Sequence, residues 1–147
     1  MGCNCLQGAF SSGGGGGGTT PLFFIPNWCD GASSNTNLFN SFWANVTYIS
    51  SGTESAVDIT MTNAFTIIRH QANLITNTKN GTVTLSFRDD ASSIQTLSIT
   101  ASTTGQFDSG EVDIDVAADS LCNYNRDSTG ASSGTHSYVE FVSCNPS

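Results

Sequence analysis

The amino-acid sequence predicts an all-β protein, a single jelly-roll-like antiparallel β-sandwich preceded by an extended, glycine-rich N-terminal arm. Three observations lead to this prediction. Short segments alternate apolar and polar residues with a period of two, turn residues separate these segments, and no amphipathic helix of useful length is present. Short strands at regular spacing are typical of sandwiches and barrels. We expect the arm at residues 1–26 and the sandwich at residues 27–147.

Period-two alternation begins at Ala44. It is clearest at residues 82–88, where Val83, Leu85 and Phe87 alternate with polar residues. The pair Asn80-Gly81 is the preferred two-residue hairpin turn. The expected strands are 44–49, 57–61, 65–70, 73–78, 82–88, 94–100, 111–116 and 137–143. We expect residues 30–41 to form a polar loop and residues 117–121 to form no more than one helical turn.

The first 26 residues differ from the rest of the chain. Six consecutive glycines occupy positions 13–18, and ordering them costs roughly 6–12 kcal/mol of backbone entropy. An apolar run between Pro21 and Pro26 reads as an edge strand or an anchoring arm. We therefore expect this segment to dock on a different subunit, and the alternative is that it packs on its own sandwich. The expected anchor residues are Leu22, Phe23, Phe24 and Ile25.

The chain contains five cysteines, an odd number, so at least one is free or pairs between chains. The candidates for disulfides or interchain contacts are Cys3, Cys5, Cys29, Cys122 and Cys144. Because Cys3 and Cys5 are one residue apart, they are poorly placed to bond each other. Reduced thiols are an equally open interpretation, because the compartment in which the protein works determines whether its cysteines form disulfides.

Charge is sparse, because only 11% of residues are charged against a usual figure of roughly 25%. The net charge is −8, and the four basic residues are scattered along the sequence: Arg69, Lys79, Arg88 and Arg126. We expect no nucleic-acid partner, because phosphate binding needs clustered cations, and no membrane partner, because no apolar run approaches roughly 20 residues. Ser, Thr, Asn and Gly supply solubility, as on many extracellular and virion proteins.

Motifs that would carry catalysis lack their structural context. Residues 130–134 (GASSG) match G-x-S-x-G, but a polar loop precedes them and a strand follows, which is not a hydrolase elbow. The acidic residues at 111, 113 and 115 have two interpretations, and we favour a solvent-exposed acidic stripe over a calcium site. His70 and His136 are too isolated for zinc. We therefore expect no enzymatic activity, cofactor or metal.

Four aromatic residues raise the question of a sugar-stacking platform: Trp28, Phe39, Phe42 and Trp43. Aromatic side chains in a β-sandwich more often fill the core or an interface, and we favour that interpretation.

Four segments in the second half of the chain form a recognisable pattern: 97–102 (LSITAS), 112–121 (VDIDVAADSL), the loop 130–134 and 138–141 (YVEF). Together they resemble jelly-roll domains of phage capsid-decoration and head-fibre proteins. The resemblance covers roughly residues 94–142. In such domains an inner strand leads to an A-G-D-x-L turn, whereas Ala118-Asp119-Ser120-Leu121 lacks the glycine. The segment is also similar to tumour-necrosis-factor-like and C1q-like jelly rolls, which form trimers.

This resemblance implies a virion structural protein, a capsid-decoration or cement subunit that stabilises a phage capsid through its arm and its oligomeric jelly roll. The expected partners are copies of itself, as a homotrimer, and the major capsid protein or neighbouring virion subunits. The expected location is the capsid surface of a virion, or otherwise the extracellular space. Two alternatives stay open: a receptor- or glycan-binding tip of a fibre or appendage, and a filament subunit that assembles by arm exchange.

Overall fold

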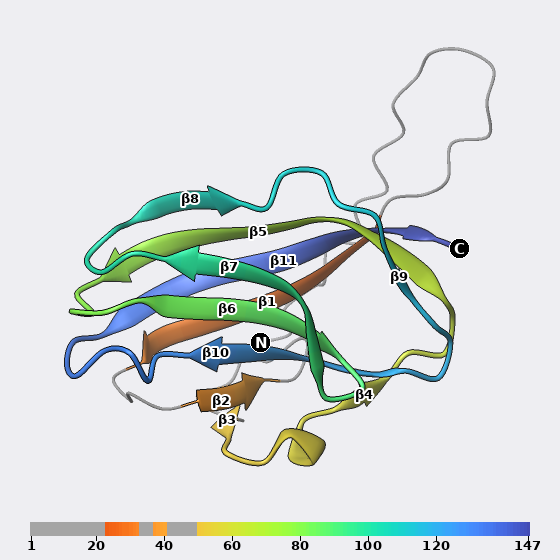
Figure 1. Cartoon of the computed structure of the whole chain (residues 1–147), viewed down its shortest axis with the longest axis horizontal. Helices are drawn as coiled ribbons and strands as arrows, with labels where there is room; N and C mark the ends of the chain where they lie inside the picture. Colours follow the sequence, from red (N-terminus) through yellow and green to blue (C-terminus); the bar gives the residue numbers. More distant parts are fainter. Residues whose placement is uncertain (1–22, 33–36, 41–49) are drawn as a thin grey trace, which may run out of the picture.

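Two antiparallel sheets pack face to face in the computed structural model, which describes residues 23–32, 37–40 and 50–147 (Figure 1). The first sheet has the order β1 (Phe23–Ala32), β11 (His136–Pro146), β5 (Phe65–Asn77), β8 (Gly105–Asp108), and β9 (Ile114–Val116) also pairs with β5. The second sheet has the order β3 (Ser50–Ser51), β2 (Asn37–Asn40), β10 (Leu121–Asp127), β6 (Val83–Asp89), β7 (Ser92–Ile99), and β4 (Ile59–Thr60) also pairs with β10. A turn of 3-10 helix, η1 (Glu54–Ala56), lies between β3 and β4.

The connections between strands are those of a jelly roll. The chain crosses from one sheet to the other between β1 and β2, β4 and β5, β5 and β6, β7 and β8, β9 and β10, and β10 and β11. The central orders β1-β11-β5-β8 and β2-β10-β6-β7 give the eight strands and two Greek keys of that fold. The predicted all-β jelly-roll-like sandwich is therefore confirmed.

The core between the sheets consists of two groups of buried side chains. One surrounds Tyr124 and Phe87, whose rings meet edge to face with centroids 5.2 Å apart. The other surrounds Leu85 and Tyr138 near the opposite end of the sandwich. Alternation along β6 places Val83, Leu85 and Phe87 inward, as their period-two pattern predicts.

The outer face of the second sheet is partly covered by the chain itself. Asn123 and Asn125 are both buried, although their strand neighbours Cys122 and Tyr124 face the core. The Asn123 amide donates to the carboxylates of Glu54 and Asp58 at 3.0 and 2.6 Å, and the Asn125 amide donates to a backbone carbonyl of β2 at 3.2 Å. The segment that includes β2, η1 and β4 thus satisfies polar groups on this sheet.

The structure differs from the prediction for the end of the N-terminal arm. β1 begins at Phe23, so the predicted boundary after residue 26 falls inside a strand. Phe23, Phe24 and Ile25 pair with Cys144, Ser143 and Val142 of β11 in the same chain, and Ile25 is buried in the core. The apolar run is therefore a sandwich strand, because alternate side chains bury against the second sheet. Leu22 and the hexaglycine lie outside the described residues.

Several expected strands also differ. The segments 65–70 and 73–78 form one continuous strand, β5, because residues 71 and 72 carry no turn chemistry. β8 was not expected, and part of the expected polar loop 30–41 is strand β2. β10 was missed because its polar residues are buried under the covering segment rather than exposed in alternation. The expected strand 44–49 lies outside the described residues.

Tyr124 joins the two sheets and supplies a test of the packing. Its hydroxyl donates to the Ile25 carbonyl of β1 and accepts from the Val142 N–H of β11 at 3.0 Å. We expect Tyr124→Phe to lower the free energy of unfolding by about 1–3 kcal/mol, because two buried hydrogen bonds are lost. Urea denaturation followed by circular dichroism measures the change. The exposed β7 control Thr96→Ala should change it by less than about 0.5 kcal/mol, and an equal effect of both variants would refute the account.

Candidate functional site

The outer face of the first sheet is built from alternate side chains of β1, β11 and β5. Along β1, Ile25 and Asn27 are buried, while Phe24 and Trp28 point outward. The strand register places Phe24 opposite Ser143 and Trp28 opposite Val139. Directly opposite residues have Cβ atoms about 4.5–5.5 Å apart, so the outward side chains of β1 and β11 form contiguous pairs.

A buried polar network fixes which side chains of β1 face outward. The Asn27 amide donates to Oε1 of Glu140 at 2.7 Å, and Nε2 of His70 lies 3.1 Å from the other carboxylate oxygen. These three residues come from β1, β11 and β5, and all are buried. A one-residue slip of β1 would remove Asn27 from Glu140 and turn Trp28 into the core. The network therefore specifies the outward position of Phe24 and Trp28.

Exposed apolar side chains concentrate on this face. Five large apolar side chains are exposed among the described residues, and four of them lie here: Phe24 (40%), Trp28 (47%), Ile75 (57%) and Val139 (38%). The fifth, Leu121, lies on β10 of the second sheet. We call Trp28, Ile75 and Val139 the apolar patch. Asn73, opposite Val139 on β5, is uncharged, as is Gln106, its partner on β8.

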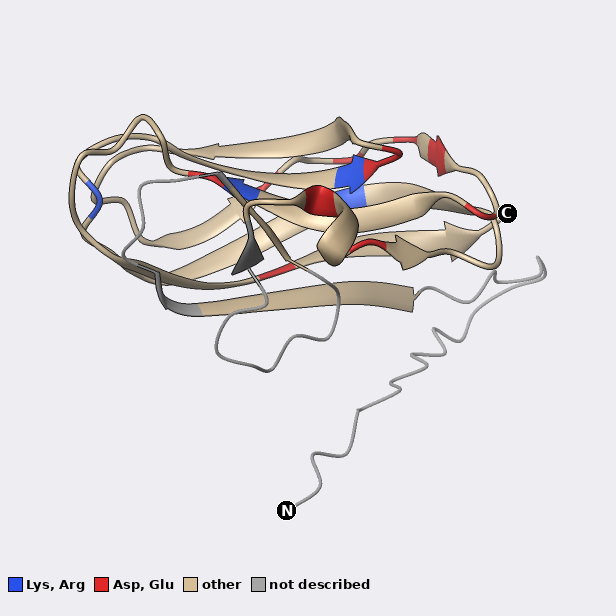
Figure 2. Ribbon diagram, turned by 90° about the horizontal axis from the view of Figure 1, so that it is seen from below, with Lys and Arg blue, Asp and Glu red and all other residues tan. Residues whose placement is uncertain are grey.

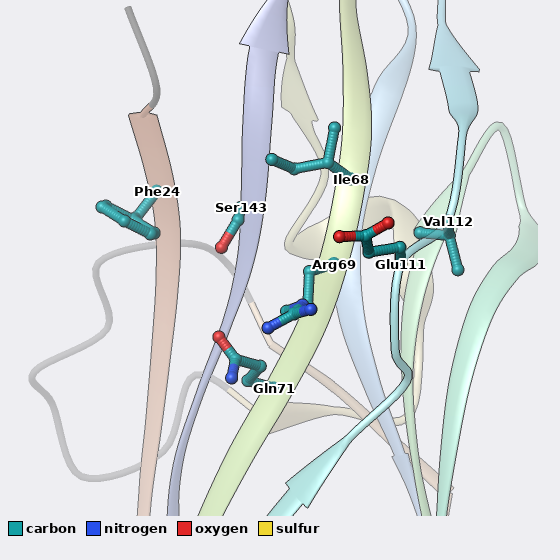
Figure 3. A pocket seen from close by; sticks show the side chains of 7 residues that line it. All are labelled: Phe24, Ile68, Arg69, Gln71, Glu111, Val112 and Ser143. Atoms are coloured by element: carbon teal, nitrogen blue, oxygen red, sulfur yellow. The ribbon is translucent and has the colours of Figure 1, made fainter. Parts of the chain in front are cut away.

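A groove of ≈ 570 Å³ lies on the same face, at the Phe24 end of β1 (Figure 3). Its lining side chains come from β1, β5, β11 and the segment between β8 and β9: Phe24, Ile68, Arg69, Gln71, Glu111, Val112 and Ser143. The Phe24 ring is braced by an edge contact with Phe141, with centroids 5.6 Å apart. Of these residues, only Phe24 is expected from the sequence to be a contact residue, because the others are brought together by strand register.

The groove carries both donors and acceptors but little net charge. The Arg69 guanidinium lies 3.5 Å from the carboxylate of Asp108, and the Gln71 amide donates to the same carboxylate oxygen at 3.0 Å. Glu111 adds a second carboxylate and is exposed. With these ionic groups charged, Arg69, Asp108 and Glu111 sum to −1.

The four basic residues, blue in Figure 2, come from β5, β6, β10 and the loop that follows β5. Their side chains form no exposed cluster. Lys79 and Arg126 are buried, and Arg69 pairs with Asp108. Arg88 binds Glu54 through two hydrogen bonds of 2.5 and 3.1 Å and lies over the Phe39 ring. The Arg88 hydrogen bond holds the pKa of Glu54 below its usual value.

The three described cysteines face the core rather than this surface. Cys122 and Cys144 are fully buried free thiols in the same core group, and the half-buried Cys29 accepts a hydrogen bond from the Arg126 guanidinium at 3.5 Å. Burial is the largest cause that raises the pKa of both Cys122 and Cys144 to about 12. Cys3 and Cys5 lie outside the described residues.

Of the residues singled out for chemistry, Ser132 and His136 both lie in the part of the chain that the structure describes. Ser132, in the G-x-S-x-G loop, accepts a hydrogen bond from the Asn80 amide at 2.7 Å. The ring nitrogens of His136 are buried without hydrogen-bond partners among the described residues. No group of three or more His, Cys, Asp or Glu side chains is placed to hold a metal ion within ranges 23–32, 37–40 and 50–147.

The two described aromatic residues of the possible platform lie on different sheets. Trp28 lies on the first sheet, whereas Phe39 lies over Arg88 on the second. Phe42 and Trp43 lie outside the described residues.

The chain matches no known protein-family profile, and no curated protein sequence matches it. In the portion that the structure describes, no helix has the length and apolar character needed to cross a membrane.

Thiol labelling tests the cysteine arrangement. We expect Cys122 and Cys144 of the native protein to resist iodoacetamide at pH 8, because burial and a pKa of about 12 keep them protonated. Both should react completely after unfolding in urea, as read by mass spectrometry. Rapid labelling of the native protein, or a disulfide between these two residues before reduction, would contradict the structure.

His136 generates a pH prediction. Burial, and then the positive charges of Arg126 and Lys79, lower its pKa from 6.5 to about 3. The unfolded chain therefore binds this proton more tightly than the folded chain, so the stability associated with neutral His136 is present above about pH 6.5 and is lost towards pH 3. His136→Phe retains an aromatic ring that stacks on Tyr138 but cannot bind a proton. Between about pH 6.5 and pH 3, we therefore expect the free energy of unfolding of this variant to fall less than that of the original chain. Parallel pH profiles measured by urea denaturation would contradict the assignment.

Proposed function

We propose that this chain is a non-catalytic virion structural protein, a capsid-decoration subunit that acts by binding neighbouring protein. The observation that carries the proposal is the concentration of exposed apolar side chains on the outer face of the first sheet, where four of the five exposed large ones among the described residues lie. The other sheet has part of its outer face covered by the same chain. Within the described part of the chain, the first sheet therefore offers the larger exposed apolar surface for recognition.

The apolar patch suits a protein partner. Trp28 and Val139 are directly opposite each other on β1 and β11, and Ile75 extends the patch across β5. Interface cores are depleted in charged residues and enriched in aromatic ones, and a Trp at the centre is a frequent energetic hot spot. The patch contains no charged side chain, so it suits a dry contact with a capsid protein or a second copy of this chain.

The homotrimer stays part of this proposal. A trimer would present three copies of the first sheet to a lattice, and three weak contacts made together bind far more tightly than one. The jelly-roll topology is compatible with the trimeric arrangement that the sequence resemblance implies.

The proposal is tested on capsids of the virus that encodes the chain, stripped of this subunit. We expect added protein to raise the temperature at which the capsids open. Trp28→Ala combined with Ile75→Ser should weaken the apparent affinity at least tenfold, equivalent to about 1.4 kcal/mol. Leu121→Ser, a similarly exposed residue on the second sheet, is the matched control and should retain binding.

Capsid opening unaffected by the added protein would contradict the decoration role. If Leu121→Ser weakened capsid binding as much as the double variant, the apolar patch would not be the binding surface.

A second candidate function, a receptor- or glycan-binding tip, is favoured by the groove beside Phe24. The third, a filament subunit built by arm exchange, depends on residues 1–22, which lie outside the described residues.

A further inference from the structure

We propose that the groove beside Phe24 binds an uncharged saccharide. This ligand site goes beyond the decoration role and lies at the start of β1, four residues before Trp28 of the apolar patch. Four lining residues define the site, the largely buried Ser143 and the more exposed Phe24, Gln71 and Glu111, and they come from three strands and one connecting segment.

The first requirement is an apolar wall for the C–H face of a pyranose ring. Phe24 is 40% exposed, and its ring is held by the edge contact with Phe141 and by the pairing of β1 with β11. A ring that is already fixed loses little freedom when a ligand stacks on it. Ile68 and Val112 add apolar surface to the groove lining.

The second requirement is a set of polar groups that match hydroxyls, each of which donates one hydrogen bond and accepts others. Ser143 supplies a hydroxyl that does both, Gln71 supplies an amide, and Glu111 supplies a carboxylate that accepts. The register sets Ser143 between Phe24 and Arg69, and Gln71 beside Phe141 on the neighbouring row. Figure 3 shows these side chains around the groove. Ligand sites commonly combine apolar walls with a few placed polar groups in this way.

The third consideration is charge. The guanidinium of Arg69 is already within 3.5 Å of the Asp108 carboxylate, and Glu111 adds another negative charge. A phosphate, sulfate or acidic sugar would meet a site with a net charge of −1, so an uncharged ligand is favoured. Its volume of ≈ 570 Å³ falls within the roughly 300–1,000 Å³ typical of ligand sites.

A glycan array that displays both neutral and acidic oligosaccharides tests the proposal on the full chain. We expect binding to neutral glycans, confirmed by titration calorimetry with the strongest one. Phe24→Ala should weaken that binding at least tenfold, because the stacking wall is lost. Glu111→Gln, in an exposed segment, should weaken it at least threefold while the thermal unfolding midpoint stays unchanged. Phe24→Leu keeps the apolar bulk that supports the fold but removes the aromatic face. This variant should therefore stay folded and still lose glycan binding.

The matched control is Trp28→Ala, since Trp28 is similarly exposed on the same strand (47% against 40% for Phe24) but lies outside the groove. It should retain glycan binding while weakening capsid attachment, so failure of this proposal and failure of the decoration role give different results. Binding to no glycan, binding to acidic glycans alone, or binding that depends on Trp28 and not on Phe24 would overturn the proposal. A capsid-protein peptide that bound in the groove, in a protein that bound no glycan, would likewise overturn the saccharide proposal.

Discussion

The buried contact between Asn27 and Glu140, extended to His70, is the constraint on which the exposed face depends. It ties three adjacent strands together on the inner side of the first sheet. A carboxylate buried in the sandwich is costly unless hydrogen bonds satisfy it, so alternative registers of β1 are penalised. Because side chains alternate along a strand, fixing Asn27 inward fixes Phe24 and Trp28 outward. A polar network in the core thereby determines an apolar and aromatic surface.

The two sheets contribute differently to the molecule. The second sheet has polar groups on its outer side satisfied by the chain, through Glu54, Asp58 and a backbone carbonyl of β2. The first sheet has no comparable cover among the described residues, and its outer side chains include most of the exposed apolar bulk. Basic residues are buried or paired with carboxylates. This distribution favours recognition by shape, aromatic contact and neutral hydrogen bonding over recognition by charge.

Sequence alone predicted the fold class because alternation is strong where one side of a strand is solvated, as in β6. It failed at β10, since Asn123 and Asn125 are polar yet buried under distant segments. The apolar run at Phe23 to Ile25 resembled a free anchor because its β11 partner lies more than a hundred residues away. The groove was not predictable for the same reason: Phe24, Ser143 and Arg69 meet only through pairing that includes a register shift at Ser143/Cys144.

Hydroxyl-radical footprinting tests most directly the claim that the outer face of the first sheet is the recognition surface. The oxidation of Trp28, Phe24 and Leu121 would be compared between the isolated protein and the protein bound to the virions that we propose it decorates. The account predicts that Trp28 loses most of its reactivity in the virion, whereas Leu121 on the second sheet stays reactive. Unchanged oxidation of Trp28 and Phe24, with protection confined to Leu121, would contradict it.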